Sequence, residues 1–329
     1  MFLMQRREAL AILAGAVVAL RVPARAQQKA MPVIGVLGLA TPNTGVLPAN
    51  LSALREGLRE AGYTEGQNFR IEYRWAEGHA DQLPALAADL VARKVDVIVT
   101  EGGDASSLAA KSATSTIPIV FHSSSNPVAI GLVASFARPG GNLTGVSLMS
   151  AELIPKLLEH LLELIPRARV VALWVDPDEP STERVMGQMQ EAARAKGVDL
   201  RVLKAHTESE TDAAFATLVQ AQPDGLVLGP VGAIRRQIAA LALRHAVPAI
   251  DWQRAFADAG GLISYGPSLT AVYHLKGIYA GKILKGAKPA ELPVQQPTTF
   301  NLFINIRTAR ALGLDLPESV LQRADQVIE

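Results

Sequence analysis

Two carboxylates separated by two glycines follow the apolar run Val95 to Thr100, in the loop Glu101-Gly102-Gly103-Asp104. Glycines at such a position let a ligand approach the backbone closely, and Asp often caps the helix that follows. A carboxylate at the mouth of a pocket pairs with a ligand ammonium. We therefore predict that Glu101, Gly102 and Asp104 contact a small ligand, while a solvated loop position stays open for Glu101.

Two other loops of the first half carry hydroxyl and amide side chains. The loop before Leu51 holds backbone donors and short polar side chains that suit a carboxylate, and the loop around His122 groups hydroxyls with an amide. Asn and Thr also serve as caps and turn residues, so a purely structural role stays open for them. The candidate ligand contacts are Thr41, Asn43, Thr44, Ser123, Ser124 and Asn126.

The second half offers loops of similar character but with aromatic and basic side chains. Its candidate contacts are Asp176, Pro230, Trp252, Arg254 and Tyr265. Trp252 and Tyr265 would clamp a flat apolar ligand while Arg254 pairs with its carboxylate. The alternatives are that Tyr265 belongs to a hinge between the two halves of the chain and that Trp252 packs at the edge of the second half.

The common catalytic and metal motifs are missing from the chain. Gly35-Val-Leu-Gly38 lies inside an apolar run without the third glycine of a dinucleotide-binding turn, and neither a phosphate-binding loop nor a Gly-x-Ser-x-Gly elbow occurs. The chain has no Cys. His122 lacks a His, Cys or carboxylate partner at the spacing of a metal site. We predict a protein that is not an enzyme, with no catalytic residue, no metal and no cofactor.

The elements that position these loops alternate between β-branched runs and amphipathic stretches. In the first half, strands are predicted over Val33 to Leu37, Phe69 to Tyr73, Val95 to Thr100 and Ile117 to Phe121, and helices over Leu51 to Ala61, Gln82 to Ala92 and Ser106 to Ala113. The strands lack polar alternation, as expected when helices cover both faces of a parallel sheet. Ligands bind such sheets beyond the carboxyl ends of the strands, where these loops lie.

The same alternation restarts near Ser147 and predicts a second sheet. Strands are expected over Val170 to Val175, Asp199 to Leu203, Gly225 to Leu228, Pro248 to Ile250 and Leu262 to Tyr265, and helices over Glu152 to Leu164, Thr182 to Lys196, Ala213 to Gln220 and Ile234 to Arg244. The predicted fold is α/β, with two doubly wound parallel-sheet lobes joined by a multi-strand hinge.

The alternation ends in the C-terminal part of the chain. A helix is predicted over Ala271 to Leu284, a Pro-rich extended segment over Lys288 to Phe300 and a helix over Phe303 to Leu312. This part fits a chain that crosses between lobes, although an ordinary linker stays open for the Pro-rich segment. Lobe one is predicted as residues 31–146 plus about 268–290, and lobe two as 147–267 plus about 300–329.

The N-terminus has the three parts of a cleavable export signal. Arg6 and Arg7 precede the apolar stretch Ala9 to Leu20, and a small-x-small pattern ends at Ala26. The apolar stretch is too short to span a bilayer. We predict a signal peptide over residues 1–26, cleavage after Ala26 and a periplasmic protein, with the twin-arginine and Sec routes both open.

Charge and hydropathy limit the classes of partner that the protein can bind. The chain has 32 Lys and Arg against 31 Asp and Glu. It therefore lacks the positive excess that binding to nucleic acid requires. No apolar run after the signal approaches the length of a membrane helix. About 300 residues remain after cleavage, more than one core usually holds, which again favours two lobes.

Several stretches resemble one family over nearly the whole chain. They are Ser115 to Phe121, Asn126 to Ser135, Arg138 to Val146, Ala259 to Gly266, Pro289 to Pro297 and the ending Leu321 to Glu329. The chain is similar to ABC transporter substrate-binding proteins, a family that includes tryptophan-type binding proteins with the type I periplasmic-binding-protein fold. It departs from them at Asn126, where relatives usually have Asp, at Glu101, where they have a small polar residue, and at Asp251, where Tyr is more frequent.

The resemblance implies a periplasmic solute-binding protein of an ABC importer. Such a protein captures a small molecule, here an amino acid or another small carboxylate, when its lobes close about the hinge. Its expected partners are the ligand and the permease subunits of the transporter, and we expect a monomer. Two alternatives stay open: an exported α/β enzyme acting on a small metabolite, and a ligand sensor that presents its closed form to a membrane receptor.

Overall fold

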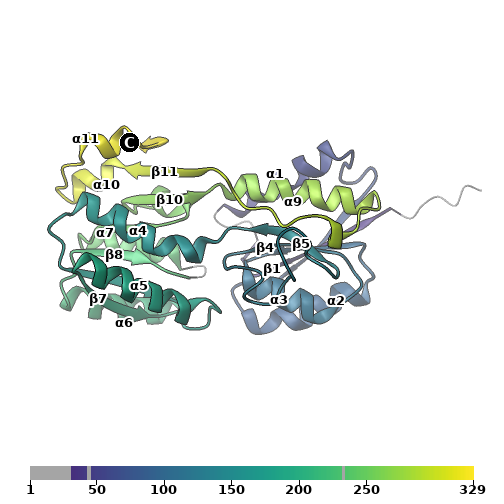
Figure 1. Ribbon diagram of the computed structural model, residues 1–329, viewed down its shortest axis with the longest axis horizontal. Coiled ribbons are helices and arrows are strands. Elements are labelled where there is room, and N and C mark those ends of the chain that lie inside the picture. The colour runs from purple at the N-terminus through teal and green to yellow at the C-terminus, as the bar shows by residue number, and fades with distance from the viewer. Residues whose placement is uncertain (1–30, 43–45, 232–233) are drawn as a thin grey trace, which may run out of the picture. The chain divides into compact units, whose positions relative to one another are not determined.

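The structure is a computed structural model that describes residues 31–42, 46–231 and 234–329. Residues Pro32–Glu329 form one compact unit, and its strands make two separate sheets with helices on their faces (Figure 1). The predicted export signal and the predicted contacts Asn43 and Thr44 lie outside the described residues. Within the described ranges, no helix is long and apolar enough to cross a membrane.

The first sheet has five strands, all parallel, in the order β2-β1-β3-β4-β5. Its strands are β1 (Val33–Gly38), β2 (Arg70–Trp75), β3 (Val97–Glu101), β4 (Ile119–Ser123) and β5 (Leu143–Ser147). The side chains of β1, β3, β4 and β5 are almost all buried on both faces, which explains the apolar runs there, whereas those of the edge strand β2 are partly exposed.

Helices from two distant parts of the chain cover this sheet. α2 (Leu83–Ala92) and α3 (Asp104–Ala113) pack on one face, and α1 (Leu47–Glu60) and α9 (Leu269–Leu284) pack on the other. Short 3₁₀ turns, η1 (Ala80–Gln82) and η2 (Pro289–Glu291), lie between the larger elements. α9 lies beside α1 in Figure 1, although about two hundred residues separate them in sequence.

The second sheet has seven strands in the order β12-β11-β10-β9-β8-β6-β7. They are β6 (Val170–Val175), β7 (Asp199–Lys204), β8 (Gly225–Leu228), β9 (Ala249–Asp251), β10 (Ile263–Pro267), β11 (Phe300–Asn305) and β12 (Gln326–Ile328). One face packs against α4 (Ser150–Leu164), α5 (Thr182–Lys196), α10 (Ile306–Ala311) and α11 (Glu318–Leu321), and the other against α6 (Glu208–Gln220), α7 (Arg235–Arg244) and α8 (Arg254–Asp258). The predicted pair of doubly wound, mainly parallel sheets is confirmed.

Three stretches of chain connect the two sheets. The first joins β5 of the first sheet to α4, which packs on β8, β9 and β10 of the second. The second joins β10 to α9, where Ser268 caps the helix by accepting the N–H of Ala271. The third leaves the bridge between Val146 and Gln295 and continues into β11.

The structure differs from two predictions of local structure. No strand was predicted over Leu143–Ser147, which forms β5, and there a Cβ on Gly145 would lie 2.0 Å from the carbonyl oxygen of Phe121. Glycine is therefore required there by the close approach of a neighbouring strand. The predicted helix over Phe303 to Leu312 is a strand up to Asn305, and the strand pairs antiparallel with β10.

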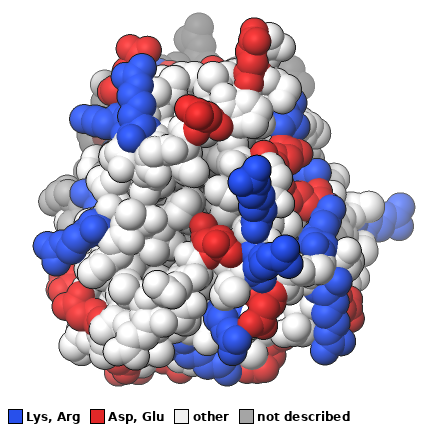
Figure 2. Space-filling model, turned by 90° about the vertical axis from the view of Figure 1, so that its left-hand side faces the viewer, with Lys and Arg blue, Asp and Glu red and all other residues white. Residues whose placement is uncertain are grey.

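The surface at the end of the second sheet carries charges of both signs. In the view of Figure 2, Lys and Arg side chains are interspersed with Asp and Glu side chains around an uncharged area. This distribution fits the formal net charge of +1. A face with mixed charges exerts little long-range attraction on a polyanion.

Candidate functional site

A small cavity of about 30 Å³ lies between the carboxyl-end loops of the two sheets. Ser124, which follows β4, lines it from the first sheet. Glu179, Pro230, Arg235 and Trp252 line it from loops and a helix start of the second sheet. The cavity thus lies where ligands bind in parallel α/β folds.

The first-sheet side of the cavity is held together by Asp104. This residue is 1% exposed and begins α3. Its Oδ1 accepts the hydroxyl of Ser123 at 2.5 Å and the backbone N–H of Ser124 at 2.9 Å. Its Oδ2 is buried and has no hydrogen-bond partner among the described residues. One oxygen therefore fixes the loop after β4, and the other remains as an acceptor beside the cavity.

Glu179 adds a second carboxylate from the other sheet. Burial raises the pKa of Glu179 to about 7, the negative charges of Asp104 and Asp176 raise it as well, and Arg235 opposes the rise. Two acidic groups from different sheets thus act on each other across the cavity. A cationic group between them would relieve their repulsion.

Arg235 supplies a positive charge on the second-sheet side. Its Nε lies 2.7 Å from Oδ2 of Asp251, which is completely buried at the end of β9. Burial raises the pKa of Asp251, whereas Arg235 and the N–H of Trp252 lower it. The guanidinium also lies 5.7 Å from the ring centroid of Trp252. The guanidinium and the indole are therefore fixed side by side, as recognition of a planar anion requires.

Three of the predicted contacts line the cavity together: Ser124, Pro230 and Trp252. Ser123 and Asp104 lie directly behind Ser124 and hold its loop. Asp176 follows β6, where its N–H donates to the carbonyl of Pro230 at 2.7 Å. These residues form one connected group at the carboxyl ends of β3, β4, β6, β8 and β9.

Other predicted contacts of the first sheet do not line the cavity, and several have local partners. Oε2 of Glu101 accepts the N–H of Ala40 at 3.1 Å, and Gly102 has a φ of +94° that favours glycine. Oδ1 of Asn126 accepts the N–H of Val128 at 3.0 Å, which is a turn cap. Thr41 is exposed in the loop after β1.

Two predicted contacts of the second sheet lie away from the cavity lining. Arg254 is exposed, with its Nε 3.4 Å from Asp258 and its guanidinium 4.7 Å from the ring centroid of Phe303. Tyr265 on β10 packs against His160 at 4.6 Å and Phe300 at 6.0 Å between ring centroids. Neither side chain lines the cavity with Trp252.

The sequence interpretation missed Glu179 and Arg235, which carry most of the charge in the cavity. Glu179 lies one position after the loop Asp176-Pro177-Asp178, which was correctly placed at the end of a strand. Arg235 is the first residue of α7, the helix after the Gly229-Pro230 loop. Both residues would have been among the predicted contacts if each strand-end loop had been extended to include the first turn of the helix that follows it.

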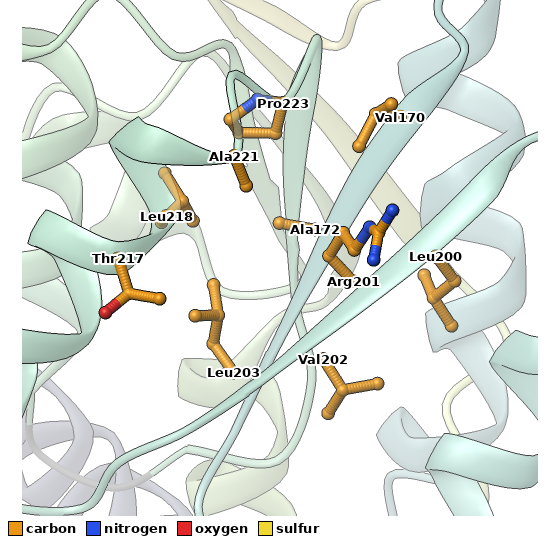
Figure 3. A pocket seen from close by; sticks show the side chains of 10 residues that line it. All are labelled: Val170, Ala172, Leu200, Arg201, Val202, Leu203, Thr217, Leu218, Ala221 and Pro223. Carbon is orange, nitrogen blue, oxygen red and sulfur yellow. The ribbon is translucent and has the colours of Figure 1, made fainter.

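A second, larger hollow lies at the opposite end of the second sheet. It is lined mainly by apolar side chains of β6, β7 and α6, together with Arg201 and Thr217 (Figure 3). Val170 and Leu200 place it near the amino ends of these strands. No carboxylate lines it, and its guanidinium, that of Arg201, is exposed and paired with Asp199, so the cavity between the sheets is the better candidate for a polar ligand.

One group of side chains has the separations that a cation could bridge. Single ligand atoms of Asp176, Asp178 and His206 lie within 4.8 Å of one another. Asp178 and His206 are exposed, and the ring of His206 already lies 3.2 Å from Glu210. Exposed acidic groups of this kind are common without a metal, and the cluster takes no part in the cavity lining.

Comparisons with known proteins agree on one family. The family model described as ABC transporter substrate binding protein matches residues 45–328. A tyrosine-binding protein of Clostridioides difficile (strain R20291) is 25% identical over 265 residues, 79% of this chain and 75% of that protein.

Two solved structures share the fold closely. One is an ABC domain in complex with L-Trp from Streptococcus pneumoniae, and the other is a conserved domain protein from Vibrio cholerae. Each has a TM-score of 0.81 and 25% identity, and each match covers 90% of this chain and 99% of the other.

Proposed function

The chain belongs to the family of ABC transporter substrate-binding proteins, and we propose that it captures an amino acid in the cavity between its two sheets. Proteins of this family bind small molecules outside the cytoplasm and deliver them to the permease of an ABC transporter. The observation that carries the proposal is the opposed charge of the cavity: Asp104 and Glu179 on one hand, Arg235 on the other. A zwitterion matches both.

The proposed contacts follow from the chemistry of each side chain. The ligand ammonium lies between Asp104 and Glu179, whose negative charges act on each other. The carboxylate lies at Arg235, which Asp251 holds in place. Trp252 offers an indole face to the ligand side chain. Tyrosine and tryptophan, bound by two relatives, are therefore the first ligands to test.

Capture is proposed to proceed by closure of two lobes. Lobe one comprises residues 31–146 plus about 268–290, and lobe two comprises 147–267 plus about 300–329. The three connections between the sheets support these boundaries, because each lies where a lobe would begin or end. A ligand that contacts both lobes binds the closed state better and so shifts the equilibrium towards it.

Export and quaternary state complete the proposal. The mature protein begins at Gln27 after removal of the signal, works in the periplasm as a monomer and turns over no substrate. N-terminal sequencing of the secreted protein checks the first point, with Gln27 expected. Recovery of an amino acid chemically unchanged after incubation checks the last.

A thermal-shift screen tests the proposed ligand class. The twenty amino acids are compared with matched compounds that lack the amine, such as 4-hydroxyphenylpropionate for tyrosine. We expect at least one amino acid to raise the melting temperature, because a ligand at 100 times its Kd stabilises the folded state by about 2.7 kcal/mol. The amine-free compound is expected to give little shift. Equal shifts from both compounds would refute the ammonium site, and no shift from any amino acid would refute the proposal.

Trp252→Ala provides the matched variant for this screen. We expect the shift from an aromatic amino acid to fall because the indole lines the cavity. Since Trp252 is also buried in the core, the shift is measured against the melting temperature of the variant without ligand. Arg254→Ala is the control, since its side chain is exposed beside Asp258.

A further inference from the structure

The first turn of α4 forms one wall of the cavity between the sheets. Ser150, Ala151 and Ile154 line the cavity, and all three are buried. This turn lies where the chain passes from β5 of the first sheet to the second sheet, on which the helix packs. One short segment therefore both connects the two sheets and closes the cavity.

The start of this segment is hydrogen-bonded to the first sheet. The N–H of Ala151 donates to the carbonyl oxygen of Ser124 at 3.1 Å, and the hydroxyl of Ser150 donates to the same oxygen at 3.4 Å. The N–H of Leu148 donates to the carbonyl oxygen of Ser123 at 2.8 Å. Residues 148–151 are therefore attached to the loop after β4, which lines the cavity from the other side.

Met149, just before the turn, has a left-handed backbone conformation. Its φ is +48° and its ψ is +32°, values that residues other than glycine adopt rarely because Cβ crowds the backbone. Its Sδ accepts a hydrogen bond from Nε2 of Gln296, which lies in the third connection between the sheets. Such a conformation persists only where the surrounding structure holds it. Another position of the turn would release this energetic cost.

Pro155 weakens the attachment of the turn to the rest of α4. It lies inside the helix and has no N–H to donate to the carbonyl oxygen of Ala151, four residues earlier. The N–H of Glu152 donates to the carbonyl oxygen of Met149 at 3.1 Å, which is the tighter bond of a 3₁₀ turn. Residues 150–154 thus lie between a left-handed residue and a missing helix bond.

The size of the cavity requires one of its walls to move. At about 30 Å³ it holds only a few water molecules, and an amino acid needs far more space. We propose that residues 150–154 are a movable gate of the cavity, which turns between Met149 and Pro155. Met149 is left-handed while the gate narrows the cavity and takes an ordinary φ when the gate moves outward. The ligand in this account rests on the proposed function, but the gate also moves in the protein without ligand.

Hydrogen exchange of residues 151–154 without ligand tests the gate, so its outcome is separate from that of the proposed function. Glycine adopts the left-handed region freely, and we expect Met149→Gly to slow exchange in the gate about fivefold. A β-branched residue is strained there, and Met149→Val should speed exchange about fivefold. Met149→Leu keeps the backbone preference of methionine and removes only the sulfur, so its exchange should match the wild type.

The order of the three variants distinguishes backbone strain from side-chain packing. Equal exchange in Met149→Gly and Met149→Val would overturn the proposal. A Met149→Leu variant that exchanges as fast as Met149→Val would overturn it equally, because loss of the side-chain contact alone would then explain the effect.

Ala246 provides the matched control for the backbone conformation. It is exposed in the turn between α7 and β9 and has a φ of +54°, close to that of Met149. Ala246→Gly and Ala246→Val should leave exchange of residues 151–154 unchanged. Changes as large as those from the Met149 variants would overturn the proposal, since general stability would then account for them.

Titration with L-tyrosine and L-tryptophan gives a second measurement, which does rest on the proposed function. Because glycine favours the narrow cavity, Met149→Gly should bind about fivefold more weakly than the wild type, and Met149→Val more tightly than Met149→Gly. Equal affinities of the Gly and Val variants would overturn the gate and leave amino acid capture intact. Failure of both amino acids to bind would count against the proposed function, while hydrogen exchange would still decide whether the gate moves.

Discussion

At the residue scale, the charged groups at the cavity are held in place before any ligand enters. Asp251 is buried and holds Arg235 at 2.7 Å, while Oδ1 of Asp104 is bonded to the loop that carries Ser124. Groups held in this way lose little freedom when a ligand binds. A zwitterionic ligand replaces water at both charged ends, and its fit depends on the distance between them.

Arg235→Met should weaken binding of the amino acid about 10- to 100-fold, because a hydrogen bond to a charged group contributes roughly 1.5–3 kcal/mol. Arg254→Met should leave the affinity within about twofold, since that side chain is exposed beside Asp258. Isothermal titration calorimetry on the two variants compares them directly. A larger loss at Arg254 than at Arg235 would show that the carboxylate binds elsewhere.

Glu179 should make binding depend on pH near neutrality. Its pKa is about 7 in the described structure, above the usual 4.5, and an ammonium ligand favours the ionised form. Affinity should therefore fall as the pH drops from about 8 to 6, and Glu179→Gln should flatten this dependence. A pH profile that stays unchanged in the variant would contradict the role of Glu179.

Without ligand, the stability of the protein should change with pH in the opposite direction to the affinity. Because the folded-state pKa of Glu179 exceeds the unfolded value, the folded state binds more protons between about pH 4.5 and 7. Glu179 therefore contributes a loss of stability as the pH rises through that window. Denaturant titrations of the wild type and Glu179→Gln should differ most above pH 7.

The sequence was sufficient to place Ser124, Pro230 and Trp252 at one site, because each follows a strand that periodicity identifies. The sequence could not show that Arg235 lines the cavity and that Arg254 does not. Both are basic residues at the start of a helix after a strand, and only the tertiary structure shows that one pairs with buried Asp251 and the other with exposed Asp258. Side-chain direction depends on partners distant in sequence.

At the element scale, α9 is the segment that ties the C-terminal part to the first sheet. It packs against α1 so closely that a Cβ on Gly277 would lie 2.1 Å from the carbonyl oxygen of Leu54. A Cβ on Gly57 would lie 2.0 Å from the carbonyl oxygen of His274. Glycine on both helices allows their backbones to approach.

Gly277→Ala should destabilise the protein by about 1–3 kcal/mol, the usual cost of overpacking a tight contact. Gly187→Ala is the matched control, because this glycine also lies inside a helix but a Cβ there meets nothing within 4 Å. The control should be neutral or stabilising by about 0.5–1 kcal/mol, since alanine favours helices. Urea unfolding measures both, and equal effects would contradict the close packing of α1 and α9.

Most elements before residue 290 could be predicted because their periodicity is strong and their boundaries carry Pro or Gly, the exceptions being the short elements β5 and α8. The segment after 300 could not. Phe303 to Leu312 is apolar enough for a helix, but Asn305 accepts the N–H of Thr308 at 2.9 Å and starts the helix late. The residues before Asn305 pair with β10, a partner that periodicity cannot reveal.

At the scale of the whole molecule, three stretches of chain join the two sheets, and the proposed closure would turn one sheet with its helices against the other about these stretches. Few-residue hinges of this kind absorb backbone changes while each sheet keeps its own core. The cavity lies between the loops that such a motion would bring together. Ligand binding and closure should therefore be one coupled event.

Closure can be measured by energy transfer between labels on the two lobes. The chain has no Cys, so Val128→Cys and Asp178→Cys place two unique labels on exposed loops of different sheets. Saturating amino acid should raise the transfer efficiency, and Arg235→Met should shift that change to higher concentrations. A transfer efficiency that stays constant at saturation would contradict closure.

The most direct test of amino acid capture between the sheets is a crystal structure of the protein with the amino acid that gives the largest thermal shift. We predict that its ammonium lies within hydrogen-bond distance of Asp104 or Glu179, its carboxylate at Arg235 and its side chain against Trp252. A ligand bound elsewhere, such as in the hollow beside β7 and α6 (Figure 3), would contradict capture in this cavity.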